Sequence, residues 1–210
     1  MSAAFTIILP HKRNPGNNAA LAICLDCLQT NTANNFILMM DAATNEPLYP
    51  RVNRMVEYAP TDCCVYWASD MFAAPNWDIP MLEAYDETTF VNNTVVEPGV
   101  IAMYGGNHKA DFGRRPDTFD RPAFEAWAAQ GHTAGGDGWF APYMFSRKAF
   151  LDTGGLDITV DPDREFGGAD MTLFDNWKAA GNRVVRAPNS FVYHLQRWSD
   201  LDEQEAEKRR

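Results

Sequence analysis

The sequence predicts an α/β fold in which a mainly parallel sheet is flanked by helices within a single domain. Short apolar runs typical of buried strands alternate with helical segments along most of the chain, which is the order that a parallel sheet requires. At 210 residues, of which 46% are hydrophobic, the chain is long enough to bury one sizeable core. It carries no internal repeat, low-complexity segment or linker, so we expect one domain over residues 1–197.

The first half of the chain opens with a short apolar strand at residues 5–9, which ends at Pro10. A polar loop then leads into the next element. In order, the elements expected in this half are a helix at about 19–29, a strand at 36–40 that ends at Asp41, a turn and short helix within 47–59, a strand at 63–67, a helix at 79–85 and a strand at 99–104.

The second half begins with residues 105–138, which are rich in Gly, Pro, Asp and Arg and predict a long functional loop. The elements expected after this loop are a strand at 140–145, a helix at 147–153, a turn at 154–157, a helix at 171–180 that ends at Gly181, and strands at 183–187 and 191–194. The charged residues 198–210 predict a terminal helix or a frayed tail.

The formal net charge of -10 argues against nonspecific binding of nucleic acid or anionic lipid, because phosphate contacts are made mostly by Lys and Arg. No apolar run approaches the roughly 18–20 residues that span a bilayer, and the N-terminus lacks a signal pattern. We therefore expect a cytoplasmic protein without a membrane partner. Its four cysteines, Cys24-x-x-Cys27 and the adjacent Cys63 and Cys64, are better explained as reduced core thiols than as a zinc site.

Two acidic residues about a hundred positions apart stand in patterns that suit a metal-assisted transfer reaction. Such a reaction needs one group that holds a cation and one that accepts a proton. Asp70 follows the apolar run 63–67 and precedes Pro75 and a helix. Asp170 follows a Gly-Gly pair and opens the helix expected at 171–180. The sequence thus offers one candidate for each role.

In these motifs the chain resembles the GT-A fold glycosyltransferases, in particular the family-2-like branch, and the resemblance runs from the opening strand to His194. That family binds a divalent metal through Asp-x-Asp after a strand, and here the triplet reads Ala68-Ser69-Asp70. Its second motif, Gly-Gly-Glu-Asp-x-Asp-Leu, carries the catalytic carboxylate and reads Gly-Gly-Ala-Asp-Met-Thr-Leu at 167–173. The resemblance implies a GT-A (Rossmann-like) fold and transfer of a sugar from a nucleotide-sugar, in particular a uridine diphosphate (UDP) sugar, to a hydroxyl group.

The resemblance also implies a metal site at Asp70, with His194 as a second ligand after the last strand. Mg²⁺ and Mn²⁺ prefer oxygen ligands, and Mg²⁺ is often held by one or two carboxylates together with phosphates. A nitrogen ligand favours Mn²⁺, so we expect Mn²⁺ (or Mg²⁺) as the cofactor. The alternative for His194 is a packed or capping histidine.

For the nucleotide-sugar, the resemblance implies contacts at the ends of the first strands. Pro10, His11 and Arg13 follow the first strand, where the family binds the nucleoside and diphosphate, and Ser69 precedes the metal-binding acid. Asp41 would accept the imide N–H of uracil, although it also suits a turn. Ligands of open α/β sheets bind at the carboxyl ends of strands, which supports this placement.

Asp170 is the candidate base, which would deprotonate the acceptor hydroxyl in an inverting displacement at the anomeric carbon. The structural alternative is a helix-capping aspartate, and the two roles are compatible. Gly167 and Gly168 would allow close approach of the sugar to the backbone. Trp139 would stack on a sugar or a base, or else belong to the core.

Two other classes of protein remain open at this point. A sugar-phosphate nucleotidyltransferase would need a Gly-rich basic loop after the first strand, which residues 11–16 match weakly. A non-catalytic nucleotide-sugar-binding module is suggested by the missing acids at positions 68, 169 and 172. The acceptor of a transferase could be a saccharide, a protein or a small molecule. It could also be a hydroxymethylated DNA base, as for phage-type glycosyltransferases, because the loop at 105–138 carries basic residues.

Overall fold

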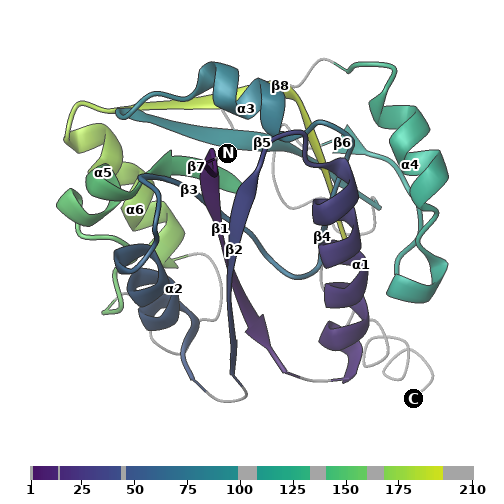
Figure 1. Cartoon of the computed structure of the whole chain (residues 1–210), viewed down its shortest axis with the longest axis horizontal. Helices are drawn as coiled ribbons and strands as arrows, with labels where there is room; N and C mark the ends of the chain where they lie inside the picture. The colour runs from purple at the N-terminus through teal and green to yellow at the C-terminus, as the bar shows by residue number, and fades with distance from the viewer. Residues whose placement is uncertain are drawn as a thin grey trace.

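The computed structural model describes residues 2–13, 15–43, 46–98, 108–132, 141–159 and 168–195. In this part of the chain eight strands form one sheet, and helices pack against both of its faces (Figure 1). The α/β class predicted from the sequence is confirmed. The strand expected at 99–104 and the charged tail at 198–210 lie outside the described residues.

The sheet has the strand order β2-β1-β3-β7-β5-β8-β4, with β6 beside β5. The strands are β1 (Phe5–Lys12), β2 (Phe36–Ala43), β3 (Cys63–Tyr66), β4 (Met71–Ala73), β5 (Thr89–Glu97), β6 (His108–Lys109), β7 (Tyr143–Ser146) and β8 (Arg183–His194). β1 runs parallel to β2 and β3, and β5 runs parallel to β8 and β6, whereas β7 and β4 are antiparallel to their neighbours. The sheet is therefore mixed, with two parallel groups joined by β7.

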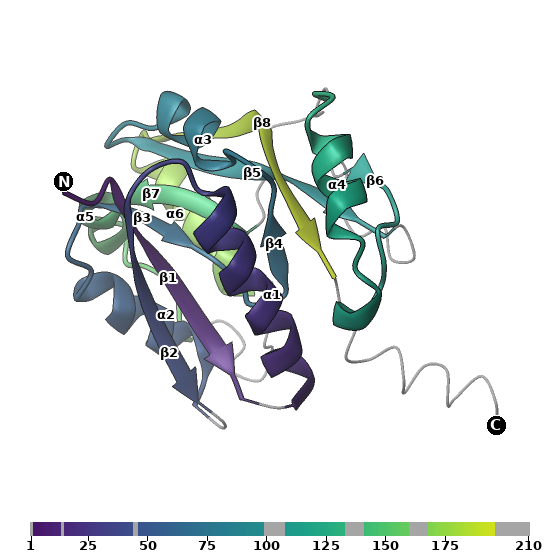
Figure 2. The same cartoon turned by 45° about the vertical axis from the view of Figure 1, so that its right-hand side comes forward.

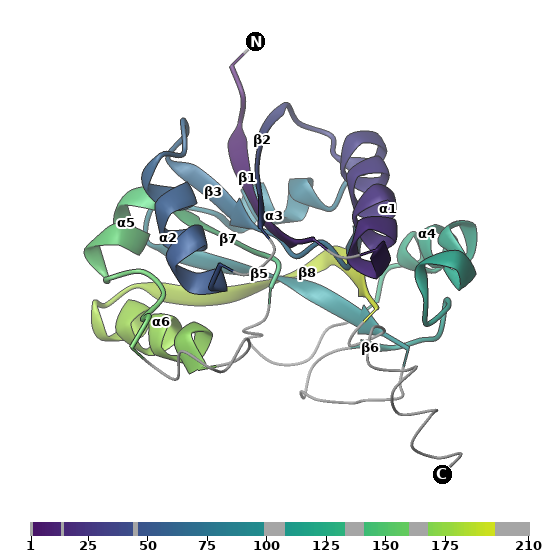
Figure 3. The same ribbon diagram turned by 90° about the horizontal axis from the view of Figure 1, so that it is seen from below.

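The helices divide between the two faces of the sheet, as Figures 2 and 3 show from two sides. They are α1 (Pro15–Asn31), α2 (Leu48–Glu57), α3 (Asp78–Ala84), α4 (Arg121–Ala128), α5 (Arg147–Asp152) and α6 (Gly168–Ala179). One apolar cluster contains residues of α1, α3 and α4, and a second contains residues of α2, α5 and α6. In β1, Ile7 belongs to the first cluster and Ile8 to the second, so both faces of this strand are buried. This explains why its sequence is continuously apolar rather than alternating.

Two helices begin earlier than expected. α1 begins at Pro15 rather than near Ala19, because proline is tolerated in the first turn of a helix, where its missing N–H would have no partner. α6 begins at Gly168 rather than at Met171. In both cases the helical pattern of apolar residues starts after the first turn, so the sequence places the start too late.

The central strand β5 was not expected from the sequence. Its burial is complete along its length, yet it carries adjacent asparagines at its centre. Asn92 donates to the Val185 carbonyl oxygen at 3.1 Å, and Asn93 donates to the Ser190 hydroxyl at 2.5 Å. These partners come from β8, about ninety residues away, and nothing in the local sequence reveals them.

The long loop expected at 105–138 contains regular structure in its described part. β6, a short 3₁₀ turn (Pro116–Thr118) and α4 lie within it. α4 begins after Asp120, whose carboxylate accepts a hydrogen bond from the Ala123 amide at 3.1 Å, and proline lies in its first turn. This is a regular helix start, so the expectation of an irregular loop was wrong for this segment. The strands expected at 183–187 and 191–194 are one strand, β8.

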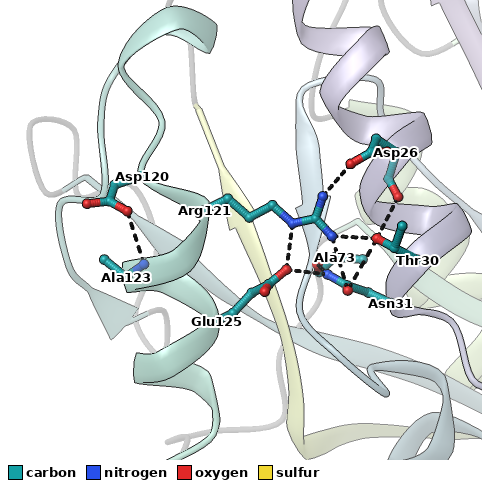
Figure 4. A network of polar contacts seen from close by, with 8 residues as sticks. All are labelled: Asp26, Thr30, Asn31, Ala73, Asp120, Arg121, Ala123 and Glu125. Carbon is teal, nitrogen blue, oxygen red and sulfur yellow. Dashed lines mark hydrogen bonds and ion pairs between the residues drawn. The ribbon is translucent and has the colours of Figure 1, made fainter.

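A polar network around Arg121 fastens α4 to α1 (Figure 4). The guanidinium contacts Asp26 and Thr30 on α1 and forms a 2.6 Å contact with Glu125 on its own helix. The Asn31 amide donates to Glu125 at 2.9 Å and to the Ala73 carbonyl oxygen at 2.8 Å. These contacts hold α4, α1 and β4 together on one face of the sheet. None of the helices in the described ranges is long and apolar enough to cross a bilayer.

Candidate active site

The ends of three strands meet at one edge of the sheet. β5 and β8 are parallel neighbours, so Glu97 at the end of β5 and His194 at the end of β8 reach the same edge. β4 is antiparallel to β8 and its first residue, Met71, pairs with His194. Asp70 therefore lies beside the end of β8, where its carbonyl oxygen accepts a hydrogen bond from the Leu195 amide at 3.2 Å. Ligands of open α/β sheets bind at this kind of edge.

At this edge His194 lies between two carboxylates. Its Nε2 is 3.5 Å from Asp70 Oδ2, and its Nδ1 is 3.2 Å from Glu97 Oε1. Burial by itself lowers the pKa of His194, but the two carboxylates outweigh burial and raise that pKa to about 9. Burial likewise raises the pKa of Asp70, but His194 outweighs it and holds the pKa below its usual range. Asp70 is thus kept ionised, and its side chain is 31% exposed.

Asp70 and His194 offer one carboxylate oxygen and one imidazole nitrogen as ligands for a metal ion. The described residues contain no group of three or more His, Cys, Asp or Glu side chains arranged to hold a metal. The two ligand atoms, Asp70 Oδ2 and His194 Nε2, are 3.5 Å apart. Such a pair nevertheless fits a cation whose remaining coordination positions are filled by substrate oxygens, because Mg²⁺ is commonly held by one or two carboxylates and phosphates. The pair of ligands fits such a shared site, and it does not fit a site closed by protein alone.

Asp170 lies in the first turn of α6 and is half-buried. The hydroxyl of Tyr143 on β7 donates a hydrogen bond to Asp170 Oδ1 at 3.2 Å. Burial raises the pKa of Asp170 to about 6, and the hydrogen bond from Tyr143 acts in the opposite direction. A carboxylate with a pKa near neutrality can accept a proton at physiological pH and is a functional-site candidate.

The phenol of Tyr66 lies within electrostatic range of both Asp170 and Asp70. Tyr66 is the last residue of β3, it is buried, and its ring centroid lies 5.1 Å from that of Tyr143. Burial raises the pKa of Tyr66 well above its usual value, and the charges of Asp170 and Asp70 raise it further. The charges of both carboxylates thus act on the Tyr66 phenol at the end of β3.

Asp41 near the end of β2 is held by two arginines of α2. Its Oδ2 lies 3.3 Å from Arg51 Nε and 3.1 Å from Arg54 Nη2. The Arg51 side chain is 3% exposed, and its guanidinium also donates to the carbonyl oxygens of His11 and Asp41. Both arginines use the same carboxylate oxygen, and no described residue donates to Oδ1 of Asp41.

Four further residues expected to bind the nucleotide-sugar lie at the end of β1, just after it, or next to Asp70. In the parallel pairing of β1 with β2, Pro10 is opposite Asp41. His11 is buried; its Nε2 contacts Asn18 Oδ1 at 2.8 Å, and its buried Nδ1 has no hydrogen-bond partner among the described residues. Arg13 is exposed, and Ser69 is half-buried in the turn before Asp70. The orphaned Nδ1 of His11 is a polar atom that a ligand would satisfy.

The structure leaves some of the expected residues aside and adds others. Trp139 and Gly167 lie outside the described residues, whereas Gly168 opens α6. Glu97 was missed because it ends the strand that the sequence did not predict. Arg51 was missed because nothing in the helical pattern of α2 shows that its side chain turns toward β1 and β2.

No family model matches the chain, and no curated protein matches it. In shape, 108 chains of solved structures match. One of them is the crystal structure of GalNAc-T7 with UDP, GalNAc and Mn²⁺, which matches 91% of this chain with a TM-score of 0.51 and 12% sequence identity. The chain spans 43% of the length of that structure. At this identity the likeness shows the fold alone, a mixed α/β domain that is GT-A-like.

Proposed function

We propose that this chain is a metal-dependent glycosyltransferase that moves a sugar from a UDP-sugar to a hydroxyl acceptor with inversion, and that Asp170 is the base. The observation that carries the proposal is the contrast between two carboxylates whose charges both act on Tyr66. His194 keeps Asp70 ionised, whereas burial raises the pKa of Asp170 to about 6. Carboxylates whose pKa values are pushed apart in one site commonly divide charge stabilisation and proton transfer between them.

Asp70 and His194 are the residues that would hold the metal. A divalent cation at this point would neutralise the charge that develops on the departing diphosphate. A nitrogen ligand favours Mn²⁺ over Mg²⁺, and the presence of Mn²⁺ with UDP in the GalNAc-T7 structure supports the same choice. The cation would share its coordination between these two side chains and the donor, since the protein supplies too few ligands by itself.

In the proposed reaction the acceptor oxygen attacks the anomeric carbon of the donor sugar. The bond from that carbon to the diphosphate oxygen breaks, and its electron pair leaves with UDP. The acceptor proton passes to Asp170, which has the pKa to accept it near neutral pH. Tyr143 orients the carboxylate through its hydrogen bond. Attack from the face opposite to the leaving group inverts the anomeric configuration.

For recognition of the base, Asp41 Oδ1 would accept the imide N–H of uracil. Arg51 and Arg54 hold the carboxylate in place through its other oxygen, so little side-chain freedom is lost on binding. Pro10, His11, Arg13 and Ser69 would line the nucleoside and diphosphate. Gly167, Gly168 and Trp139 stay proposed contacts of the sugar.

The proposed acceptor is a hydroxyl group of a saccharide, a protein, a small molecule or a modified DNA base. The GalNAc in the GalNAc-T7 structure supports a sugar as one of the two substrates.

The test of the proposed function begins with a thermal-shift screen of uridine, guanosine and adenosine nucleotide-sugars with Mn²⁺ or with excess chelator. UDP-sugars are expected to raise the melting temperature in Mn²⁺ alone, because a ligand that binds the folded state stabilises it.

UDP release and product mass are then measured with the donor found in the screen. Release of UDP without an acceptor, or transfer to a saccharide panel, would establish the enzyme. Stabilisation by a UDP-sugar without any turnover would instead indicate a binding module. A chain that is neither stabilised by nor active on any nucleotide-sugar would contradict the proposal.

A further inference from the structure

The carboxylate of Glu97 is the most deeply buried acidic group near the site. Its side chain is 3% exposed, at the end of the central strand β5. A buried carboxylate is costly unless it is paired and hydrogen-bonded. Its contact with the site is His194 Nδ1 at 3.2 Å, and the mechanism above gives Glu97 no part in binding or proton transfer.

The imidazole of His194 is oriented by this contact. One ring nitrogen, Nδ1, is directed at Glu97, and the other, Nε2, is directed at Asp70. When Nδ1–H donates a hydrogen bond to Glu97, the neutral ring has its lone pair on Nε2, beside the ionised carboxylate of Asp70. Histidines that bind metals usually donate their other N–H to a carboxylate or carbonyl group, which fixes the tautomer and the ring orientation.

We propose that Glu97 is a positioning residue that holds His194 in the orientation and tautomer in which Nε2 binds the metal. The proposal rests on the metal site of the proposed function and adds a residue that the sequence patterns did not reveal. It is supported by the position of Glu97 as well as by the distance. β5 is an interior strand that pairs with β7 and β8, so the backbone that carries the carboxylate is held on both sides by the sheet.

The competing explanation is that Glu97 and Asp70 only clamp a charged histidine for stability. The two explanations differ in what happens to the metal. A clamp without a positioning role would change the melting temperature and leave the metal affinity and the metal–nitrogen contact as they are. A positioning role would change both of these properties, even in a variant that folds normally.

The experiment compares wild-type protein with Glu97→Ala, Glu97→Gln and the exposed control Glu83→Gln in the presence of UDP. Mn²⁺ affinity is measured from the free Mn²⁺ signal by electron paramagnetic resonance, and pulsed measurements report the coupling of bound Mn²⁺ to a histidine nitrogen. Removal of the carboxylate is expected to weaken Mn²⁺ binding by roughly 10- to 100-fold and to diminish the nitrogen coupling. Glu97→Gln is expected to lose less and to keep the coupling, because its amide oxygen still accepts a hydrogen bond from Nδ1–H.

Three results would contradict parts of this account in distinguishable ways. Unchanged affinity and coupling in Glu97→Ala would overturn the positioning role and leave the proposed function intact. Wild-type protein that binds Mn²⁺ without nitrogen coupling would remove His194 from the metal site, and with it this inference. If Glu97→Ala does not fold, Glu97→Gln decides: the proposal expects binding weakened several-fold, and wild-type affinity would overturn it.

Discussion

Tyr143 donates a hydrogen bond to Asp170 at 3.2 Å. The tyrosine belongs to β7, the antiparallel strand between the two parallel groups of the sheet, and the aspartate lies in the first turn of α6. The tyrosine is buried and the aspartate half-buried, and the contact stabilises the ionised form of the carboxylate against the effect of burial. The balance between these two influences sets the pH at which Asp170 ionises.

Activity is therefore expected to fall on the acid side with an apparent pKa of about 6, because protonated Asp170 cannot accept the acceptor proton. Tyr143→Phe removes a hydrogen bond that favours the charged form. The acid limb of kcat/KM should then move to higher pH by roughly half a unit to one unit. A pH–rate profile of both proteins checks this, and an unmoved limb would show that another group titrates.

Asp170→Asn should also change stability in a pH-dependent way. The pKa of Asp170 in the folded protein, about 6, lies above that of an unfolded aspartate. The folded state thus binds more protons between about pH 4 and 6, and the contribution of this group to the free energy of unfolding falls as pH rises through that window. The two pKa values differ by about two, and a difference of one is worth about 1.4 kcal/mol, so the variant, which cannot ionise, should gain about 3 kcal/mol relative to wild type at pH 8 and little at pH 4. Denaturant unfolding at the two pH values measures this difference, and an equal difference at both would contradict it.

Asp41→Ala is expected to raise the KM for a uridine donor more than it lowers kcat, because recognition of the base is mostly uniform binding. Glu46→Gln is a matched control, since Glu46 also pairs with Arg54 but is more exposed than Asp41. Steady-state kinetics of the two variants distinguish two causes of a raised KM: loss of the contact between Asp41 and the uracil base, and loss of an ion pair of Arg54. The same rise in KM in both variants would remove Asp41 from the donor site.

Asp70→Asn should weaken UDP binding when Mn²⁺ is present and leave metal-free binding almost unchanged. The neutral amide is a poorer ligand for a hard cation than a carboxylate. Calorimetric titration of UDP with Mn²⁺ or excess chelator measures the effect, and the exposed Asp117→Asn is the control. Tight UDP binding and full turnover in excess chelator would contradict a metal-dependent reaction.

The sequence was informative where local pattern and function coincide. Asp70 could be singled out because it follows an apolar strand and precedes a proline turn, and in the structure its carboxylate lies beside His194. The assignment of these residues to a metal remains a prediction. The fold class could be predicted because each strand and each helix shows its own pattern of apolar residues within a short segment, and these segments alternate along the chain.

The rest depends on contacts that only the folded chain creates. Asn92 and Asn93 make the sequence of β5 polar at its centre, and their hydrogen-bond partners lie on β8. Because β5 was not predicted, Glu97 could not be recognised as the end of a strand. Arg51 belongs to a helix whose pattern indicates its buried face, but the hydrogen bonds of its guanidinium to β1 and β2 are set by packing. Residues that act through neighbours distant in sequence are therefore the ones that sequence analysis missed.

The central claim is that Asp170 takes the acceptor proton, and single-turnover transfer by Asp170→Asn tests it most directly. Asparagine keeps the size of the side chain and an oxygen that can accept the hydrogen bond from Tyr143, but it cannot accept the proton, so transfer should slow by roughly 100-fold or more while donor affinity stays near wild type. Asp175→Asn, an exposed change on the same helix, should transfer at the wild-type rate. If Asp170→Asn keeps most of its rate, or if the product retains the anomeric configuration of the donor, Asp170 is not the base of an inverting reaction.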